Sequence, residues 1–162
     1  ALVVLGSMNT TTVEQARRLA THEGVTTLRI DAVPLCTGGN QRGRWVEEAV
    51  SALSSGRSAM LTTSLSTLVP ALRNAVAPHL GALAARVANC IDPAAVVVSG
   101  GDTGSCLCAA LEIGTLRVRG QILPGIVCSR GIDSRGVAKT IISKAGGFGG
   151  PHTLAELLEP QQ

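Results

Sequence analysis

Two glycine-rich segments are the parts of this sequence best suited to binding an anion. Residues 99–104 read Ser-Gly-Gly-Asp-Thr-Gly after an apolar run, and residues 144–150 read Lys-Ala-Gly-Gly-Phe-Gly-Gly after another. Glycine lets the backbone approach a ligand closely, and the first turn of a helix points free N–H groups at a negative charge. Two such turns in one small domain predict a phosphate-bearing ligand, and a nucleotide is the ligand that this pattern favours.

Within the first segment, Asp102 and Thr103 carry side chains that could take part in chemistry. Thr103 offers a hydroxyl group to a phosphate. Asp102 could cap the helix, hold Mg²⁺, or accept a proton from an attacking hydroxyl group. The alternative is an ordinary capped turn, in which aspartate is also common. The motifs GxxxxGK(S/T) and GxGxxG are both absent, so the residues alone leave both interpretations open.

The second segment has three glycines within four positions, which a plain helix cap explains poorly. We expect Gly146 and Gly147 to pass close to a ligand or to a neighbouring strand. Lys144 either neutralises phosphate charge or is solvated, as isolated lysines usually are. Phe148 either packs on an adenine ring or fills the core, and the core is the interpretation that we favour.

Apolar runs alternate with helix-like segments along most of the chain. We expect strands at residues 2–5, 25–30, 59–63, 94–98, 116–118, 121–123 and 138–143. We expect helices at residues 10–21, 45–53, 65–90, 106–111 and 153–158, the longest broken near Pro70 or Pro78. Loops are expected at residues 34–40 and 129–136.

This alternation predicts an α/β fold, a three-layer sandwich in which helices cover both faces of a mainly parallel sheet. In such sheets the ligand lies at the carboxyl ends of the strands. That rule places four segments along one edge, namely Gly6-Ser7 and residues 62–64, 100–104 and 146–149. No linker divides the chain, so we expect one domain over residues 1–162.

The composition narrows the class of protein. Hydrophobic residues make up 45% of the chain, yet Trp45 and Phe148 are its only aromatic residues, so the core must be aliphatic. The net charge of +3 is scattered, and few aromatics are available for stacking, so nothing supports nucleic-acid binding. No apolar run approaches the roughly 20 residues that span a bilayer. We therefore expect a soluble, cytoplasmic protein.

The cysteines and histidines do not form a recognisable metal or catalytic motif. The five cysteines are irregularly spaced, and Cys106 and Cys108 do not form a CxxC pair. We interpret them as reduced thiols and assign no metal-ligating residues. The three histidines are isolated, without the serine or cysteine and acid partners of a triad.

Taken in order, these segments resemble the four-carbon acid sugar kinase family, and more narrowly its C-terminal nucleotide-binding domain. The matching elements are Gly6-Ser7, Ser-Gly-Gly-Asp-Thr at residues 99–103, Pro124-Gly125, and Lys-Ala-Gly-Gly-Phe-Gly at residues 144–149. The resemblance covers essentially the whole chain. Together the second and fourth elements are fairly specific, whereas Gly6-Ser7 alone is not.

The resemblance implies a kinase that uses ATP to phosphorylate threonate, erythronate or 3-oxo-tetronate. The family's ATP contacts map onto Ser7, residues 100–103 and Gly146, and we add Gly147 from the glycine pattern. The family's N-terminal domain supplies most of the acid-sugar site and is absent from these 162 residues. The chain alone is therefore expected to bind ATP or ADP but not to turn over.

The leading hypothesis is phosphoryl transfer from ATP and Mg²⁺ to a hydroxyl group of a small carboxylated sugar, with Asp102 contacting Mg²⁺ or that hydroxyl group. The alternative is a non-catalytic module that senses a nucleotide or a phosphorylated metabolite. A third interpretation is an α/β scaffold without a ligand. The sequence leaves a homo-oligomer open.

Overall fold

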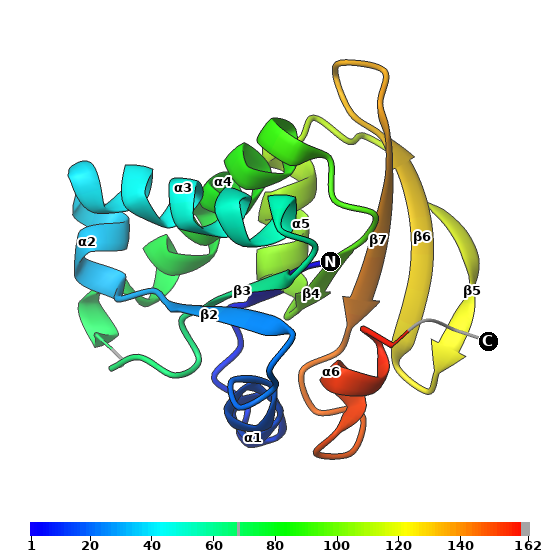
Figure 1. The fold of residues 1–162 in the computed structure, drawn as a ribbon, viewed down its shortest axis with the longest axis horizontal. Helices are drawn as coiled ribbons and strands as arrows, with labels where there is room; N and C mark the ends of the chain where they lie inside the picture. Colours follow the sequence, from blue (N-terminus) through cyan, green and yellow to red (C-terminus); the bar gives the residue numbers. More distant parts are fainter. Residues whose placement is uncertain (68, 160–162) are drawn as a thin grey trace.

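A seven-stranded sheet organises the part of the chain that this computed structural model describes, residues 1–67 and 69–159 (Figure 1). The strands lie in the order β2-β3-β1-β4-β7-β6-β5. Their bounds are β1 (Leu2–Leu5), β2 (Val25–Arg29), β3 (Ser58–Thr62), β4 (Val96–Ser99), β5 (Arg117–Leu123), β6 (Ile126–Ile132) and β7 (Ala138–Lys144). The strands from β2 to β7 in that order pair in parallel, whereas β6 pairs antiparallel with β7 and β5. The carboxyl ends of β3, β1, β4 and β7 therefore lie side by side at one edge.

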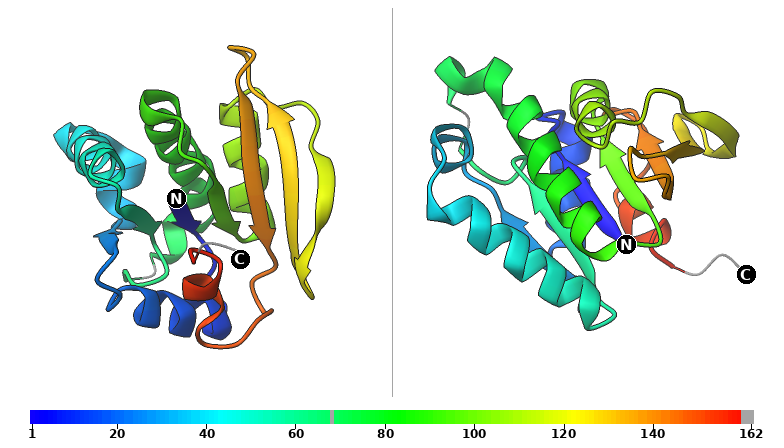
Figure 2. Two further views of the ribbon diagram at one scale, coloured as in Figure 1. Left: turned by 45° about the vertical axis from the view of Figure 1, so that its right-hand side comes forward. Right: turned by 90° about the horizontal axis from the view of Figure 1, so that it is seen from above.

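Helices cover both faces of the parallel strands (Figure 2). On one face lie α3 (Asn40–Ser54), α4 (Arg73–Ile91) and α5 (Gly101–Ala110), with the short helix α2 (Ala32–Thr37) beside them. On the other face lie α1 (Thr10–Leu19) and α6 (Thr153–Glu156). Leu2 and Val4 of β1 face the first core and Val3 and Leu5 face the second, all with 0% exposure. This confirms the three-layer prediction.

Several elements differ from the predicted ones because the local sequence pattern does not show which strands pair with each other. Pro34 suggested a loop but is the third residue of α2, where the missing N–H removes no helical hydrogen bond. Residues 129–132, expected in a loop, belong to β6 and pair with β7. The two short strands expected around Gly120 form the single strand β5, with register shifts on either side of that glycine.

The helices that flank the sheet edge also begin elsewhere than expected. A 3-10 turn, η1 (Pro70–Leu72), precedes α4, so the helical region is interrupted at Pro70, one of the two expected positions. Pro78, the other, lies inside α4 without ending it. Helix α5 starts at Gly101 rather than at Cys106. The residues of the first glycine-rich segment are therefore themselves the first turn of a helix.

Helices α4 and α5 pack backbone against backbone. A Cβ atom on Gly81 of α4 would lie 2.8 Å from the carbonyl carbon of Cys106 and 2.8 Å from the nitrogen of Leu107. Only glycine permits this separation. The contact fixes the N-terminal turn of α4 relative to that of α5.

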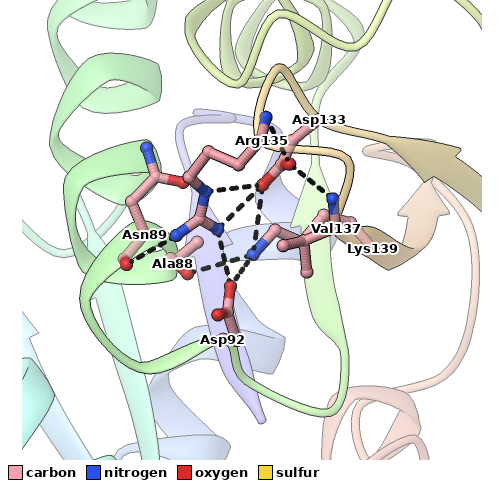
Figure 3. Close-up of polar contacts among 7 residues, drawn as sticks. All are labelled: Ala88, Asn89, Asp92, Asp133, Arg135, Val137 and Lys139. Atoms are coloured by element: carbon pink, nitrogen blue, oxygen red, sulfur yellow. Dashed lines mark hydrogen bonds and ion pairs between the residues drawn. The ribbon is translucent and has the colours of Figure 1, made fainter.

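A partly buried ion cluster ties the β6–β7 turn to the end of α4 (Figure 3): Asp133 and Lys139 are buried, whereas Asp92 and Arg135 are exposed on one side. The Arg135 guanidinium lies 2.8 Å from a carboxylate oxygen of Asp133 and 2.7 Å from one of Asp92. The Lys139 ammonium donates to Asp92 and lies 3.6 Å from Asp133. Burial by itself raises the pKa of Asp133, but hydrogen bonds from Arg135 and from the backbone N–H of Val137 outweigh it and lower the pKa to about 2.

Within the described residues, no helix has both the length and the apolar character that crossing a membrane requires.

Candidate functional site

A cavity of about 710 Å³ lies at the carboxyl edge of the sheet. Residues that follow β1, β3, β4 and β7 line it, together with the first turns of α4. All residues that the sequence singled out for binding line this one cavity: Ser7, Gly100, Gly101, Asp102, Thr103, Gly146 and Gly147. The two glycine-rich turns are thus on the same side of the molecule.

The first turn combines one glycine with a positive φ and one glycine beside open space. Gly100, the residue before α5, has φ +103°, in the left-handed region that glycine occupies readily. Among the described residues, a Cβ atom on Gly101 would meet no atom within 4 Å, and Gly101 lines the cavity, so a side chain here would extend into open space at the cavity. Thr103 is buried, and its hydroxyl group lies where a Cβ atom on Gly6 would collide with it. Thr103 therefore packs the end of β1 against α5.

The first turn of α5 lies at the cavity, and among the described residues its first amides have no acceptor. The first hydrogen bond of this helix runs from the N–H of Gly104 to the carbonyl oxygen of Gly100, at 3.0 Å. The N–H groups of Gly101, Asp102 and Thr103 precede that bond and have no acceptor within the helix. Together with the helix dipole they form a site of positive potential.

The second turn is held through its carbonyl oxygens. The Thr12 hydroxyl group donates to the carbonyl of Gly146 at 2.8 Å, and the Lys144 ammonium donates to the carbonyls of Ala145 and Gly146 at 3.0 and 3.2 Å. In the described part of the chain, the N–H groups of Gly146 and Gly147 have no backbone acceptor. The carbonyl oxygens of the turn thus hold it in place, and the N–H groups of Gly146 and Gly147 remain available at the cavity.

Gly146 is required by packing as much as by any ligand. A Cβ atom there would lie 2.8 Å from the Oγ atom of Ser7. The Ser7 loop is itself fixed, because the Ser64 hydroxyl group donates to the carbonyl of Ser7 at 2.6 Å. Both sides of the cavity floor are therefore preorganised.

Helix α1 supplies two residues that the sequence interpretation missed. Thr12 and Gln15 are buried polar residues, and Gln15 donates through Nε2 to the carbonyls of Phe148 and Gly150 at 3.1 and 2.8 Å. Their signal in the sequence is their position beside Ala16 and Leu19 on the apolar stripe of this helix, where an unpaired polar group would be costly.

Two charged side chains line the cavity among the described residues, Asp102 and Arg73. The sequence interpretation missed Arg73 because it placed this residue within a longer helix, whereas Arg73 begins α4 at the cavity. Lys144 is buried behind the second turn, and burial lowers its pKa.

In the part of the chain that the structure describes, no cluster of three or more histidine, cysteine or acidic residues could hold a metal ion. A cation here would therefore need oxygen ligands from a bound molecule in addition to Asp102.

Phe148 does not fill the core, contrary to the prediction. Its side chain is 49% exposed and lies on the β5–β6 turn, where a Cβ atom on Gly125 would collide with the ring. Gly125 has φ +73°, so the expected Pro124-Gly125 turn is confirmed. Gln15 holds the backbone of Phe148 at the surface, which directs the ring outward onto this turn.

Comparison with known proteins gives a family match over nearly the whole chain. The model of the family described as "Nucleotide-binding C-terminal domain" matches residues 2–154. Among curated proteins, the chain is similar to a D-threonate kinase of Salmonella typhimurium, with 28% identity over 97% of this chain and 41% of the relative. It is also similar to a 3-oxo-tetronate kinase of Cupriavidus necator, with 30% identity over 97% of this chain and 37% of the relative.

A solved structure agrees with these matches. A domain of unknown function from Bordetella bronchiseptica, crystallised as a domain-swapped dimer with bound citrate, superposes with a TM-score of 0.81 at 27% identity. That match covers 97% of this chain and 39% of the Bordetella chain. The chain spans about two fifths of the length of the curated relatives.

Proposed function

Because the chain belongs to the family of nucleotide-binding C-terminal domains, we propose that it is the ATP-binding domain of a kinase that phosphorylates a four-carbon acid sugar. The acceptor would be of the threonate, erythronate or 3-oxo-tetronate type. The observation that carries the proposal is the meeting of two sets of unpaired backbone amides at one cavity, from α5 and from residues 146–147.

The residues of the cavity fit a nucleotide. Its volume of about 710 Å³ lies within the usual range for small-molecule sites. The space beside Gly101 would be filled by any side chain, so glycine at this position keeps the amides accessible. Apolar residues Val76 and Ala77 on α4 line another part of the cavity and offer a surface for a base.

The chain's own contribution to catalysis would be positioning and charge stabilisation. The amides of Gly101 and Gly147 would bind phosphate oxygens, and Arg73 would add a mobile positive charge. When bound with ATP, Mg²⁺ would neutralise charge on the phosphates, and Asp102 is the residue that would hold it. The other role for Asp102 is to accept the proton of the acceptor hydroxyl group.

The acid sugar itself would bind mainly to another domain. The chain spans about two fifths of its curated relatives, so residues 1–162 would be the nucleotide-binding part of a two-domain kinase. Turnover would then require both parts. A homo-oligomer of the whole protein is part of the same proposal, since the Bordetella protein was crystallised as a domain-swapped dimer.

The sparse set of charged groups in the cavity also fits a second function. Among the described lining residues, Asp102 is the only carboxylate and Arg73 the only cation. Such a set is sufficient for binding without catalysis. A non-catalytic module that senses a nucleotide or a phosphorylated metabolite is therefore the alternative.

Calorimetry with ATP and ADP, followed by a coupled kinase assay with a separately produced N-terminal part, tests these functions. Nucleotide binding together with turnover on an acid sugar only after both parts are mixed supports the kinase. Binding without restored turnover favours the sensing module. If neither nucleotide binds at millimolar concentration, the proposed function is wrong.

A further inference from the structure

Strand β7 carries two buried lysines that differ in what surrounds their charge. Lys139 and Lys144 are each 2% exposed. The ammonium of Lys139 donates to Asp92 and lies close to Asp133, as Figure 3 shows. The ammonium of Lys144 donates only to backbone carbonyls, and among the described residues no carboxylate lies within 4 Å of it.

A buried charge without an opposite charge is costly for a fold. Taking an ammonium out of water has a free-energy cost that carbonyl oxygens offset only in part, which explains why buried lysines are normally paired. Lys139 follows that rule, and Lys144 does not. The two hydrogen bonds to the turn explain a donor at position 144, but a neutral donor would make them without this cost, so the charge of Lys144 needs a further reason.

The position of Lys144 supplies that reason. Its ammonium binds the carbonyl oxygens of Ala145 and Gly146, on the opposite side of the peptide chain from the cavity-facing amides. A negatively charged ligand bound to these amides would be separated from the Lys144 ammonium only by the backbone of the turn. Because the Lys144 side chain is buried, solvent would screen the attraction between its ammonium and the ligand far less than the attraction between the exposed Arg73 and the ligand.

We propose that Lys144 supplies the positive charge of the phosphate site from behind the second glycine turn, without touching the ligand. The inference rests on the proposed function, since it requires that the ligand be a nucleotide polyphosphate. Lys144 is a positioning and charge-supplying residue in this scheme, not a catalytic one. The missing counter-charge of the buried ammonium is the ligand itself.

The test uses two neutral replacements, Lys144→Met and Lys144→Gln, with Lys139→Met as the matched control on the same strand. Calorimetry measures binding of ATP, ADP, AMP and adenosine, and thermal unfolding measures stability. Glutamine can still donate a hydrogen bond to the turn, whereas methionine cannot, so the pair separates charge from hydrogen bonding.

We expect both Lys144 variants to lose at least about tenfold in ADP affinity, because a unit charge at short range in a poorly screened site has an effect of that order. The loss should be larger for ATP, smaller for AMP and absent for adenosine. The unfolding temperature of both variants should equal or exceed that of the original protein. Lys139→Met should lower the unfolding temperature, since it leaves Asp133 without one of its cations, and should leave ADP affinity within about twofold.

Three results would overturn the inference while leaving the proposed function intact. The first is ADP binding by Lys144→Gln equal to that of the original protein, which would assign the effect to hydrogen bonding. The second is an equal loss for adenosine and ADP. The third is a fall in unfolding temperature as large as that of Lys139→Met. Failure of the original protein to bind ATP or ADP at all would instead refute the proposed function.

Discussion

Gly101 gives the sharpest test of a phosphate site at the first turn of α5. In the part of the chain that the structure describes, a Cβ atom there would meet no atom within 4 Å, so a side chain can be added without a clash with these residues. Gly101 is also the first residue of the helix and has no positive φ, so a side chain adds no backbone strain. We therefore expect the Gly101→Val substitution to occupy the part of the cavity beside the α5 amides and to leave the fold unchanged.

The size of the effect follows from the amides that the new side chain would cover. A hydrogen bond from a neutral amide to a charged oxygen contributes about 1.5–3 kcal/mol. Displacing a phosphate from two of the amides at this turn would cost about 3–6 kcal/mol, which corresponds to a loss of affinity between about 100-fold and about 20,000-fold. The free energy of unfolding should change by less than about 1 kcal/mol.

Calorimetry with ADP and denaturant unfolding measure the two quantities. Gly120→Val in β5 is the matched control, because a Cβ atom there also meets nothing within 4 Å and the residue lies outside the cavity. The control should bind ADP as the original protein does. If Gly101→Val also binds ADP with unchanged affinity while the original protein binds it, no phosphate lies at this turn and the reasoning from the helix N-terminus is wrong.

Three further predictions follow from the hydrogen bonds and charges of the site and the ion cluster. Thr12→Val removes the donor to the carbonyl of Gly146 and should lower ADP affinity about fivefold in calorimetry, whereas Thr12→Ser should restore it; equal affinities would show that this bond does not hold the turn. Asp102→Asn should leave ADP binding in the absence of Mg²⁺ unchanged and remove the gain in affinity that Mg²⁺ gives; a gain that persists would exclude Asp102 as its ligand. The pKa of Asp133 is lowered from 3.8 to about 2 in the folded protein, so the unfolded chain binds its proton first as the pH falls. Its contribution to stability should thus be complete above about pH 4 and be lost towards pH 2, and Asp133→Asn should flatten the unfolding free energy over this window in acid titrations; an unchanged slope would contradict the role of the Arg135 pair.

The glycine turns could be predicted from the sequence because glycine reports on the backbone directly. The positive φ of Gly100 and the crowding at Gly146 are constraints that only glycine satisfies, and both lie at strand ends. The parallel order of the strands then places these ends at one edge. The glycine pattern and the parallel order of the strands are therefore enough to predict the residues on the glycine-rich side of the cavity.

The rest depends on contacts between distant segments, which a single sequence does not report. Arg73 reaches the cavity because η1 delays the start of α4; Pro70 signalled a break in the helix, but the sequence could not show that the residue after the break lies at the cavity. Thr12 is recognisable as a site residue only when the Gly146 carbonyl is placed beside it. Phe148 was expected in the core because aromatic residues are scarce in this chain, yet the turn that carries it directs the ring outward.

The glycine contact between α4 and α5 extends the functional site to a residue that no ligand would touch. Since Gly81 lets the two backbones meet, Arg73 and the α5 amides are carried by two helices whose spacing is set about one turn beyond Ala77, a residue of α4 that lines the cavity. A single methyl group at that contact would wedge the helices apart and widen the cavity from the rear. We therefore expect substitutions of Gly81, which would touch no ligand, to alter the cavity as substitutions of its lining residues would.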